Sequence, residues 1–434
     1  MKKLFPASNI LEMRERILNL SMQYSLYVIL DSCPQAIFEN IPLHYKMIAG
    51  FGAIKKLTVN QNALNKLNDF LSENGDCWKF GMLSYDLKNE IEHLSSNNND
   101  AIQFPLLHFF IPEIVIGLKE NCVEIECLKE ETAEGIYHQL LNSVHKKFHL
   151  NNAEFVFPEI EDYSQTIDKI KYHLHRGDIY EMNYCIQLLQ QCSIDPLPVY
   201  KNLTQFSPSP FSCFAKVNEH YLMSASPERF IAKKGLKIFS QPMKGTSKRS
   251  KNKTEDDILK NQLWQNEKER AENVMIVDLV RNDLSRIANR GSVKVDELFG
   301  VYTFPAVHQM ISTVSAGLRE GIFFTDIIKA MFPMGSMTGA PKVRAMQLIE
   351  EVENFKRGIF SGSVGYIDPN GDFDFNVVIR SIIYNSETNQ LSIPAGSAIT
   401  AKSHPMQEYN ECLLKAKGML TALGIAEPAN EIRQ

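Results

Sequence analysis

The sequence predicts an α+β fold built mainly from antiparallel strands. Strand-like runs follow one another directly at residues 221–224, 230–232 and 236–241, and again at 362–367, 373–384 and 391–395. Few helical segments separate these runs, which favours antiparallel pairing over parallel strands joined by crossover helices. Helices are expected at residues 164–175, from an N-cap at Thr254 past Val274, and from Ser403 to Leu420.

Composition is that of a globular protein with a large core. Of the 434 residues, 44% are hydrophobic and 22% are charged, and the formal net charge is −5. This charge argues against nucleic-acid binding and against attachment to anionic membranes. No stretch approaches the roughly 20 apolar residues that span a bilayer, and charged residues at 12–16 interrupt any signal peptide, so we expect a cytoplasmic protein.

Two further features bear on organisation. The eight cysteines include no CxxC pair, so reduced structural thiols are expected rather than a zinc or redox site. The alternation of helix and strand becomes longer after Tyr163. We therefore expect an N-terminal region over residues 1–155 and a second domain over residues 156–425.

Four carboxylates form two matched pairs on predicted helices: Glu269 with Glu272, and Glu408 with Glu411. A spacing of three residues places each pair on one helix face. Two such faces brought together would offer the oxygen ligands that Mg²⁺ prefers. From spacing alone, ordinary acids on solvated helices are the commoner explanation.

Several other side chains could act on a ligand. Lys244 ends a strand in a turn marked by Pro and Gly, where burial would favour the neutral amine needed for nucleophilic attack. A surface lysine is the plainer alternative. Residues 335–342 fail as a phosphate loop but could cradle a carboxylate. Tyr366 could reach a ligand and Arg380 offers a planar fork, although isolated residues of these kinds are usually structural.

Taken together and in order, these segments resemble the chorismate-utilising enzyme family. The matching blocks are SASPERF, QPMKGT, ERAENVMIVDLVRNDLSRIA, FPMGSMTGAPKVRAM, SGSVGYID, VVIRS and EYNE. Residues 80–87, FGMLSYDL, resemble the appendage domain of anthranilate and aminodeoxychorismate synthases. The resemblance implies two large stacked antiparallel sheets with helices outside and the active site between them, the fold of anthranilate synthase component I.

One position distinguishes classes within the family. Aminodeoxychorismate synthases carry a lysine where anthranilate synthases carry alanine, and this chain has Lys244 there. The resemblance implies that the lysine amine attacks C2 of chorismate as the C4 hydroxyl leaves. Ammonia then adds at C4 and expels the lysine, giving 4-amino-4-deoxychorismate. Glu228 matches the family's proposed general acid/base.

The resemblance also implies binding roles. Because the substrate is a dianion, Mg²⁺ is expected as a counter-charge, held by Glu272 and Glu411 with Glu269 and Glu408 in support. The residues expected to bind the enolpyruvyl and ring carboxylates are Arg380, Tyr366, Gly396, Ser336 and Lys342.

The chain also departs from the family pattern. Glu181 stands where a glutamine is common, and where isochorismate-forming members have a lysine that activates water. Gln309 occupies the histidine position of anthranilate synthases, and His308 precedes it. In the run AGSAITAKS, Ser397 and Ala398 replace the usual residues, which could narrow backbone access to the substrate carboxylate.

Ammonia must come from another protein. Most free ammonia is ammonium at neutral pH, so family members take it from a glutamine amidotransferase. This chain shows no glycine-flanked Cys elbow followed by His and Glu, so we expect a separate amidotransferase subunit. Three rival functions are an anthranilate synthase, an isochorismate or salicylate synthase, and a catalytically silent binding subunit. Lys244 argues against all three, and Glu181 against the second.

Overall fold

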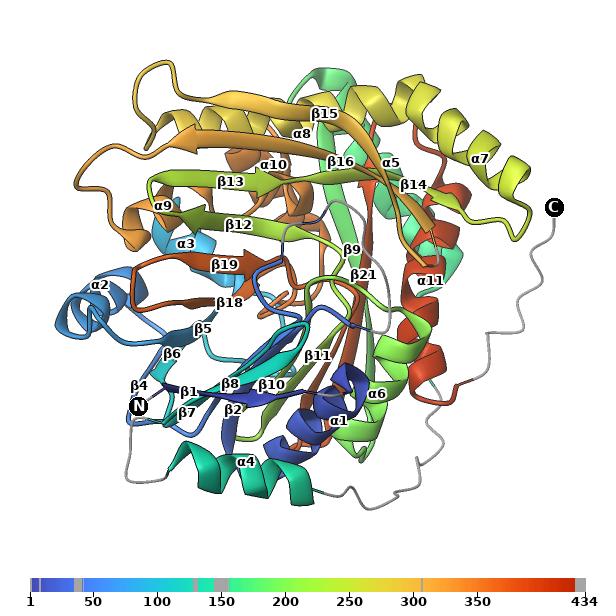
Figure 1. Ribbon diagram of the computed structural model, residues 1–434. Coiled ribbons are helices and arrows are strands. Elements are labelled where there is room, and N and C mark those ends of the chain that lie inside the picture. Colours follow the sequence, from blue (N-terminus) through green and yellow to red (C-terminus); the bar gives the residue numbers. More distant parts are fainter. Residues whose placement is uncertain are drawn as a thin grey trace.

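The computed structural model describes residues 2–7, 9–34, 41, 43–127, 132–143, 155, 157–305 and 307–425. Two large antiparallel sheets are stacked, and helices cover them on the outside (Figure 1). The α+β prediction and the stacked-sheet expectation are both confirmed.

The first sheet, sheet A, contains eleven strands within the described residues, and each pairs antiparallel with its neighbours. In spatial order they are β1 (Lys2–Pro6), β8 (Cys122–Cys127), β7 (Ile114–Leu118), β3 (Met47–Phe51), β2 (Leu26–Asp31), β10 (Ser212–Val217), β11 (His220–Ser224), β20 (Ser381–Asn385), β21 (Gln390–Ile399), β9 (Glu181–Gln191) and β17 (Gly339–Ala340).

The second sheet, sheet B, contains ten strands of the described chain. In spatial order they are β14 (Met243–Lys248), β16 (Val307–Gly317), β13 (Lys237–Gln241), β12 (Arg229–Lys234), β19 (Phe373–Asn376), β18 (Ser363–Ile367), β5 (Lys79–Leu83), β6 (Leu107–Ile111) and β4 (Lys55–Val59), while β15 (Lys294–Thr303) pairs with β16 off this path.

The N-terminal region contributes strands to both sheets. In sheet A, β2 pairs with β10, and in sheet B, β5 pairs with β18, so strands from both halves of the chain share each sheet. The domain boundary that we expected at residue 155 falls beside residues 144–154 and 156, which lie outside the described residues. The boundary stays a prediction.

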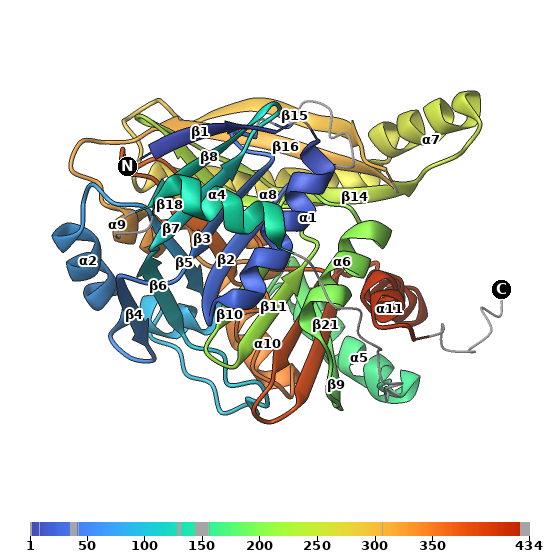
Figure 2. The same cartoon turned by 60° about the horizontal axis from the view of Figure 1, so that its bottom comes forward.

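The helices flank the sheets (Figures 1 and 2). They are α1 (Ile10–Leu20), α2 (Ala63–Glu73), α3 (Lys88–Ile91), α4 (Ala133–Asn142), α5 (Ile160–Arg176), α6 (Pro196–Phe206), α7 (Lys253–Gln265), α8 (Glu267–Ser285), α9 (Phe324–Met331), α10 (Lys342–Val352) and α11 (Pro405–Ala422), with short 3₁₀ turns at η1 (Ser21–Gln23), η2 (Tyr85–Leu87) and η3 (Gly335–Met337). Across the described residues, none of these helices is long and apolar enough to cross a bilayer.

The core has two main parts. In one, apolar side chains of sheet A pack against helices α1, α4, α5, α6 and α11. In the other, side chains of both sheets pack together with α8 and α9. Helix α5 illustrates the pattern, because Ile167, Ile170 and Leu174 are buried at helical spacing and Gly177 ends the helix with φ 78°.

One long helix that we predicted from Thr254 is two helices. The side chain of Asn252, not Thr254, caps α7 by accepting a hydrogen bond from the Glu255 amide. Asn266 then ends α7 and caps α8, accepting a hydrogen bond from the Glu269 amide. The N-cap at Thr254 was therefore wrong, and the break sets the direction of α8, which carries Glu269 and Glu272.

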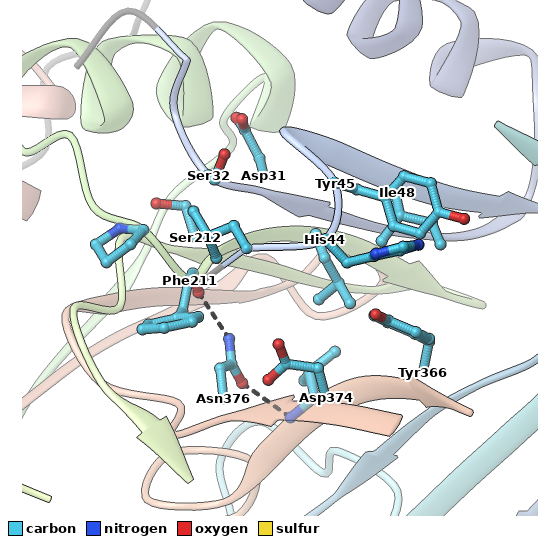
Figure 3. A pocket seen from close by; sticks show the side chains of 14 residues that line it. Asp31, Ser32, His44, Tyr45, Ile48, Phe211, Ser212, Tyr366, Asp374 and Asn376 are labelled. Atoms are coloured by element: carbon cyan, nitrogen blue, oxygen red, sulfur yellow. Dashed lines mark hydrogen bonds between the residues drawn. The ribbon is translucent and has the colours of Figure 1, made fainter. Parts of the chain in front are cut away.

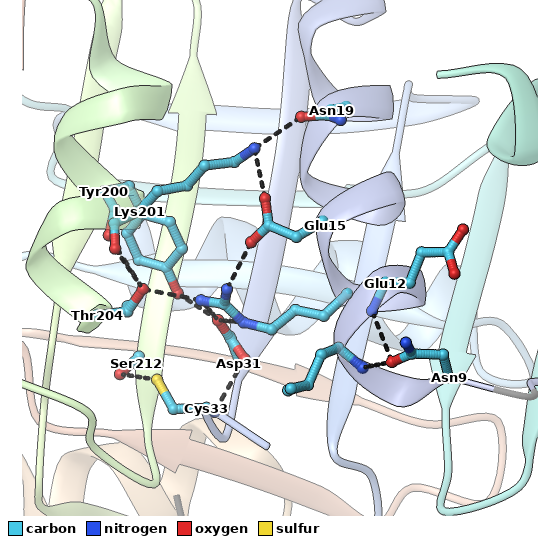
Figure 4. A network of polar contacts seen from close by, with 12 residues as sticks. Asn9, Glu12, Glu15, Asn19, Asp31, Cys33, Tyr200, Lys201, Thr204 and Ser212 are labelled. Atoms are coloured by element: carbon cyan, nitrogen blue, oxygen red, sulfur yellow. Dashed lines mark hydrogen bonds and ion pairs between the residues drawn. The ribbon is translucent and has the colours of Figure 1, made fainter. Parts of the chain in front are cut away.

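A buried ion pair ties the N-terminal helix to the second half of the chain (Figure 4). Arg14 of α1 contacts the Asp31 carboxylate at 2.7 Å, and both side chains are at most 6% exposed. Tyr200 and Thr204 of α6 complete the network, at 3.0 Å from Asp31 and 2.8 Å from Arg14 respectively. Because a buried charge left without its partner is costly, this network fixes α1 against α6.

Candidate active site

The centre of the site is an ion pair between Lys244 and Glu181. The Lys244 ammonium lies 2.5 Å from Glu181 Oε1, and the two side chains are 11% and 1% exposed. Lys244 lies in β14 where the pairing with β16 shifts register, next to Gly245 with φ 82°. This irregular backbone places the lysine against β9 of the other sheet.

Lys244 is held in its protonated form. Burial lowers its pKa, but nearby carboxylates, Glu181 above all, raise it by more, so the pKa lies above its usual value. We expected burial to favour the neutral amine, and burial does act in that direction, but the net shift is towards the ammonium form. The reason is that the acids facing Lys244 outweigh its desolvation.

Glu228 is the second acid of the site. It immediately precedes β12 and is 5% exposed, and the Ser336 hydroxyl donates a hydrogen bond to its Oε1 at 2.8 Å. Burial raises the pKa of Glu228 to about 7, although the Ser336 hydrogen bond and the Lys244 charge oppose this. A carboxyl with this pKa can hold or release a proton near neutral pH.

The predicted acidic pairs come from α8 and α11. Burial raises the pKa of Glu272 to about 7 and also raises the pKa of Glu269, with Glu411 of α11 among the charges that contribute to the latter. The ion pair with Lys415 at 2.6 Å helps to hold the pKa of Glu411 below its usual value despite burial. Glu269 of α8 and Glu411 of α11 therefore lie within electrostatic range of each other, while Glu408 is buried and its charge acts on Tyr163 of α5.

These acids suit a cation without forming a closed ligand shell. Glu272 Oε1 is buried and has no hydrogen-bond partner among the described residues, and Lys268 Nζ is 3.9 Å away. The described part of the chain contains no group of three or more His, Cys, Asp or Glu side chains arranged to bind a metal. Mg²⁺ needs only one or two protein carboxylates and keeps its waters, and Glu272 has the free, buried carboxylate oxygen that such a site requires.

Arg380 and Lys415 bring positive charge to a neighbouring cleft of about 400 Å³. Arg380 lies in a break between β19 and β20 with φ 52°, and donates a hydrogen bond to the Lys415 carbonyl at 3.2 Å. Burial lowers the pKa of Arg380 to about 10. The Lys415 ammonium in turn contacts the Gly396 carbonyl at 2.7 Å. Sequence reasoning missed Lys415, although it lies one helical turn beyond Glu411.

Gln309 and His308 point in different directions from β16. Gln309 lines the cleft, where it donates a hydrogen bond to the Gly245 carbonyl at 2.7 Å and accepts one from the Thr246 hydroxyl at 2.9 Å. His308 is 1% exposed and pairs with Asp256 of α7 at 3.0 Å. Gln309, not His308, is therefore the residue of this pair that faces the site.

Two predicted substrate ligands lie away from the cleft. Tyr366 of β18 lines a separate pocket with His44 and Asp374 (Figure 3). Lys342 is held by Asp283 of α8 at 2.5 Å, so it joins α10 to α8. Sequence reasoning could not separate these positions, because a motif gives residue identity and not the direction of each side chain.

Arg357 is a second residue that sequence reasoning missed. It pairs with Glu353 at 2.5 Å, and both side chains are 1% exposed. Its guanidinium also donates to the Asn183 carbonyl in β9 and to the Met337 carbonyl in η3, at 2.8 and 2.7 Å. Arg357 thereby fixes the strand that carries Glu181 beside the turn that carries Ser336. A Glu–Arg pair four residues apart normally indicates a surface helix, so nothing in the sequence singled it out.

Comparison with known proteins identifies the family of the chain. The family model for chorismate binding enzymes matches residues 32–421. Aminodeoxychorismate synthase component 1 of Bacillus subtilis (strain 168) is 35% identical over 369 residues, 81% of this chain and 78% of the relative. Anthranilate synthase component 1 of Aquifex aeolicus (strain VF5) is 32% identical over 373 residues, 81% of this chain and 75% of the relative.

The fold is similar to that of a solved relative. The crystal structure of anthranilate synthase component I from Streptococcus pneumoniae TIGR4 matches with a TM-score of 0.76 and 26% identity, covering 88% of this chain and 93% of that chain. The stacked-sheet fold is therefore shared with this relative. The chain belongs to the family of chorismate binding enzymes and is a chorismate-utilising enzyme.

Proposed function

We propose that this enzyme aminates chorismate at C4 to give 4-amino-4-deoxychorismate, through a covalent bond to Lys244. The observation that carries the proposal is the burial of Lys244 beside the acids Glu181 and Glu228. A buried lysine paired with a carboxylate can pass a proton to that partner and act as a nucleophile, so this arrangement supports covalent chemistry at Lys244. Similarity to aminodeoxychorismate synthases supports the same reaction.

The chain supplies both a nucleophile and a proton donor. The amine of Lys244 attacks C2, the two ring double bonds shift, and the C4–O bond breaks. Glu228, whose pKa is about 7, gives its proton to the departing hydroxyl, which leaves as water. Ammonia then attacks C4, the double bonds shift back, and the lysine leaves C2.

Charge complementarity supports a site for the dianionic substrate. Arg380 and Lys415 lie at the cleft and offer cations to a carboxylate, and the backbone at Gly396 lies beside them. Glu272 and Glu411, supported by Glu269, would hold Mg²⁺, which when bound supplies positive charge for the ring carboxylate. Tyr366 and Lys342 take supporting roles in this proposal, because each is engaged elsewhere in the fold.

Ammonia is proposed to come from a separate glutamine amidotransferase subunit. The purified chain should then give no product from chorismate, Mg²⁺ and glutamine, whereas ammonium salts at alkaline pH should replace the partner. Product from glutamine with no second protein present would contradict the proposal for the partner alone.

Product identity tests the reaction. We expect mass spectrometry to find 4-amino-4-deoxychorismate after incubation with chorismate, Mg²⁺ and ammonium. The rival supported by the Aquifex aeolicus relative, an anthranilate synthase, would give anthranilate instead.

The variant Lys244→Ala tests the covalent route. It should lose amination at C4, because it lacks the nucleophile. Lys248→Ala, at the exposed end of the same strand, is the matched control and should keep the activity. Amination at C4 by Lys244→Ala at the wild-type rate would contradict the covalent mechanism.

A further inference from the structure

Glu181 occupies an unusual position for a carboxylate. It begins β9, where it pairs with Ala340 of β17, and its side chain is 1% exposed. Oε1 accepts the hydrogen bond from Lys244, while Oε2 is buried and has no hydrogen-bond partner among the described residues. Burying a charged carboxylate whose second oxygen has no hydrogen-bond partner costs free energy, so the presence of Glu181 at this position needs an explanation.

The surrounding backbone holds Glu181 in place. Gly339 of β17 lies so close that a side chain there would come within 2.2 Å of the Glu181 carbonyl oxygen. Two residues along β9, the Asn183 carbonyl is fixed by Arg357. The carboxylate is therefore presented to Lys244 from a rigid strand rather than from a flexible loop.

Five acids interact with the charge of Lys244, and they come from four elements. Glu181 comes from β9, Glu228 from the turn before β12, Glu269 and Glu272 from α8, and Glu411 from α11. Of these, Glu181 is the one with a direct hydrogen bond to the lysine nitrogen in the described structure. Glu228 is instead bonded by Ser336. Glu181 therefore contacts the nucleophile, whereas Glu228 does not and can donate a proton to the leaving group.

We propose that Glu181 is a further catalytic residue, the base that takes the proton from Lys244 so that its amine can attack chorismate. This inference rests on the proposed function. An N–H bond of the ammonium breaks, the O–H bond of Glu181 forms, and the freed electron pair makes the bond to C2. When ammonia later expels the lysine, the proton returns from Glu181 to the amine. Glu228, having protonated the leaving hydroxyl, recovers its proton from the new C4 ammonium.

The amide variant Glu181→Gln tests this role. It keeps the size of the side chain and can still accept a hydrogen bond from Lys244, but it cannot take a proton. The measurement is the rate of the covalent adduct in the full chain, mixed with chorismate and Mg²⁺ without ammonia and followed by intact-protein mass spectrometry from pH 6 to 10. We expect the rate at pH 7 to fall about 100-fold and to recover towards wild type as the pH rises.

A purely restraining role predicts the opposite result. If Glu181 only holds Lys244 in its ammonium form, its removal makes the lysine easier to deprotonate, because the pairing charge is lost. Glu181→Gln would then form the adduct at pH 7 as fast as wild type or faster, and the proposal would be overturned. Glu387→Gln, in an exposed turn, is the control and should leave the pH profile unchanged.

A second variant guards against a folding defect. Glu181→Asp keeps a carboxylate that lies one methylene farther from the amine, so it should retain more of the rate at pH 7 than the amide variant. An aspartate no better than the amide would contradict the role of a base. If wild type forms neither adduct nor aminated product, the proposed function itself fails; if wild type forms both and Glu181→Gln matches it at every pH, this inference alone fails.

Discussion

Replacing Arg357 should destabilise the protein far more than is usual for an arginine paired with a glutamate four residues away, because such pairs normally lie on the surface. Arg357→Met removes a guanidinium that is 1% exposed and leaves the Glu353 carboxylate buried without its partner. The carbonyls of Asn183 and Met337 lose their donors as well. Removing one member of a buried pair costs about 3–5 kcal/mol, which is a large share of a typical domain's stability.

Urea unfolding followed by circular dichroism measures this cost. Arg344→Met, in the preceding helix α10, is the matched control, because Arg344 forms a 3.6 Å pair with Glu351 in which the side chains are 35% and 58% exposed. Such an exposed pair contributes about 0–1 kcal/mol. Combining Glu353→Gln with Arg357→Met should recover part of the loss, since no buried charge is left alone. A loss in Arg357→Met within 1 kcal/mol of the control would refute the reasoning.

Two further outcomes follow from the acids. The pKa of Glu228 is raised from 4.5 to about 7, so its contribution to the free energy of unfolding is present below pH 4.5 and lost as pH rises through 7. The free energy of unfolding of Glu228→Gln, measured in urea, should therefore rise relative to that of wild type by about 3 kcal/mol between pH 4.5 and pH 8. Parallel plots of this free energy against pH for the two proteins would contradict the prediction. Mg²⁺ should raise the Tm more at pH 8 than at pH 6, because Glu272, with pKa about 7, must ionise to bind it. Glu272→Gln should abolish that shift and exposed Glu267→Gln should keep it; no shift in wild type would count against the site.

The strands and most helices could be predicted because their signals are local. Alternating apolar runs and turn residues placed β11, β12, β13, β18 and β21 close to their observed positions. The break between β19 and β20 was missed, because residues 377–379 continue an apolar run and nothing marks Arg380 as taking a positive φ. Backbone conformation of this kind is set by tertiary contacts rather than by local preference.

The sequence identified most of the acidic residues of the site but fewer of its positively charged residues. Spacing and motif order identified Lys244, Glu228 and Glu272, which the fold brings together. Lys415 and Arg357 carried no signal, since each depends on which segments lie next to it in space. The effect of nearby acids on the pKa of Lys244 was missed for the same reason: these acids come from segments such as β9 and α8, which are far apart along the chain.

The shared sheets have a consequence for how the chain reaches its fold. During synthesis β2 emerges long before β10, its partner at Ser212–Val217, and β5 before β18 at Ser363–Ile367. Until those later strands appear, each early strand has one edge with unsatisfied backbone groups. The nascent N-terminal third must therefore be shielded from premature association, and expressing it alone should yield aggregates rather than a folded fragment.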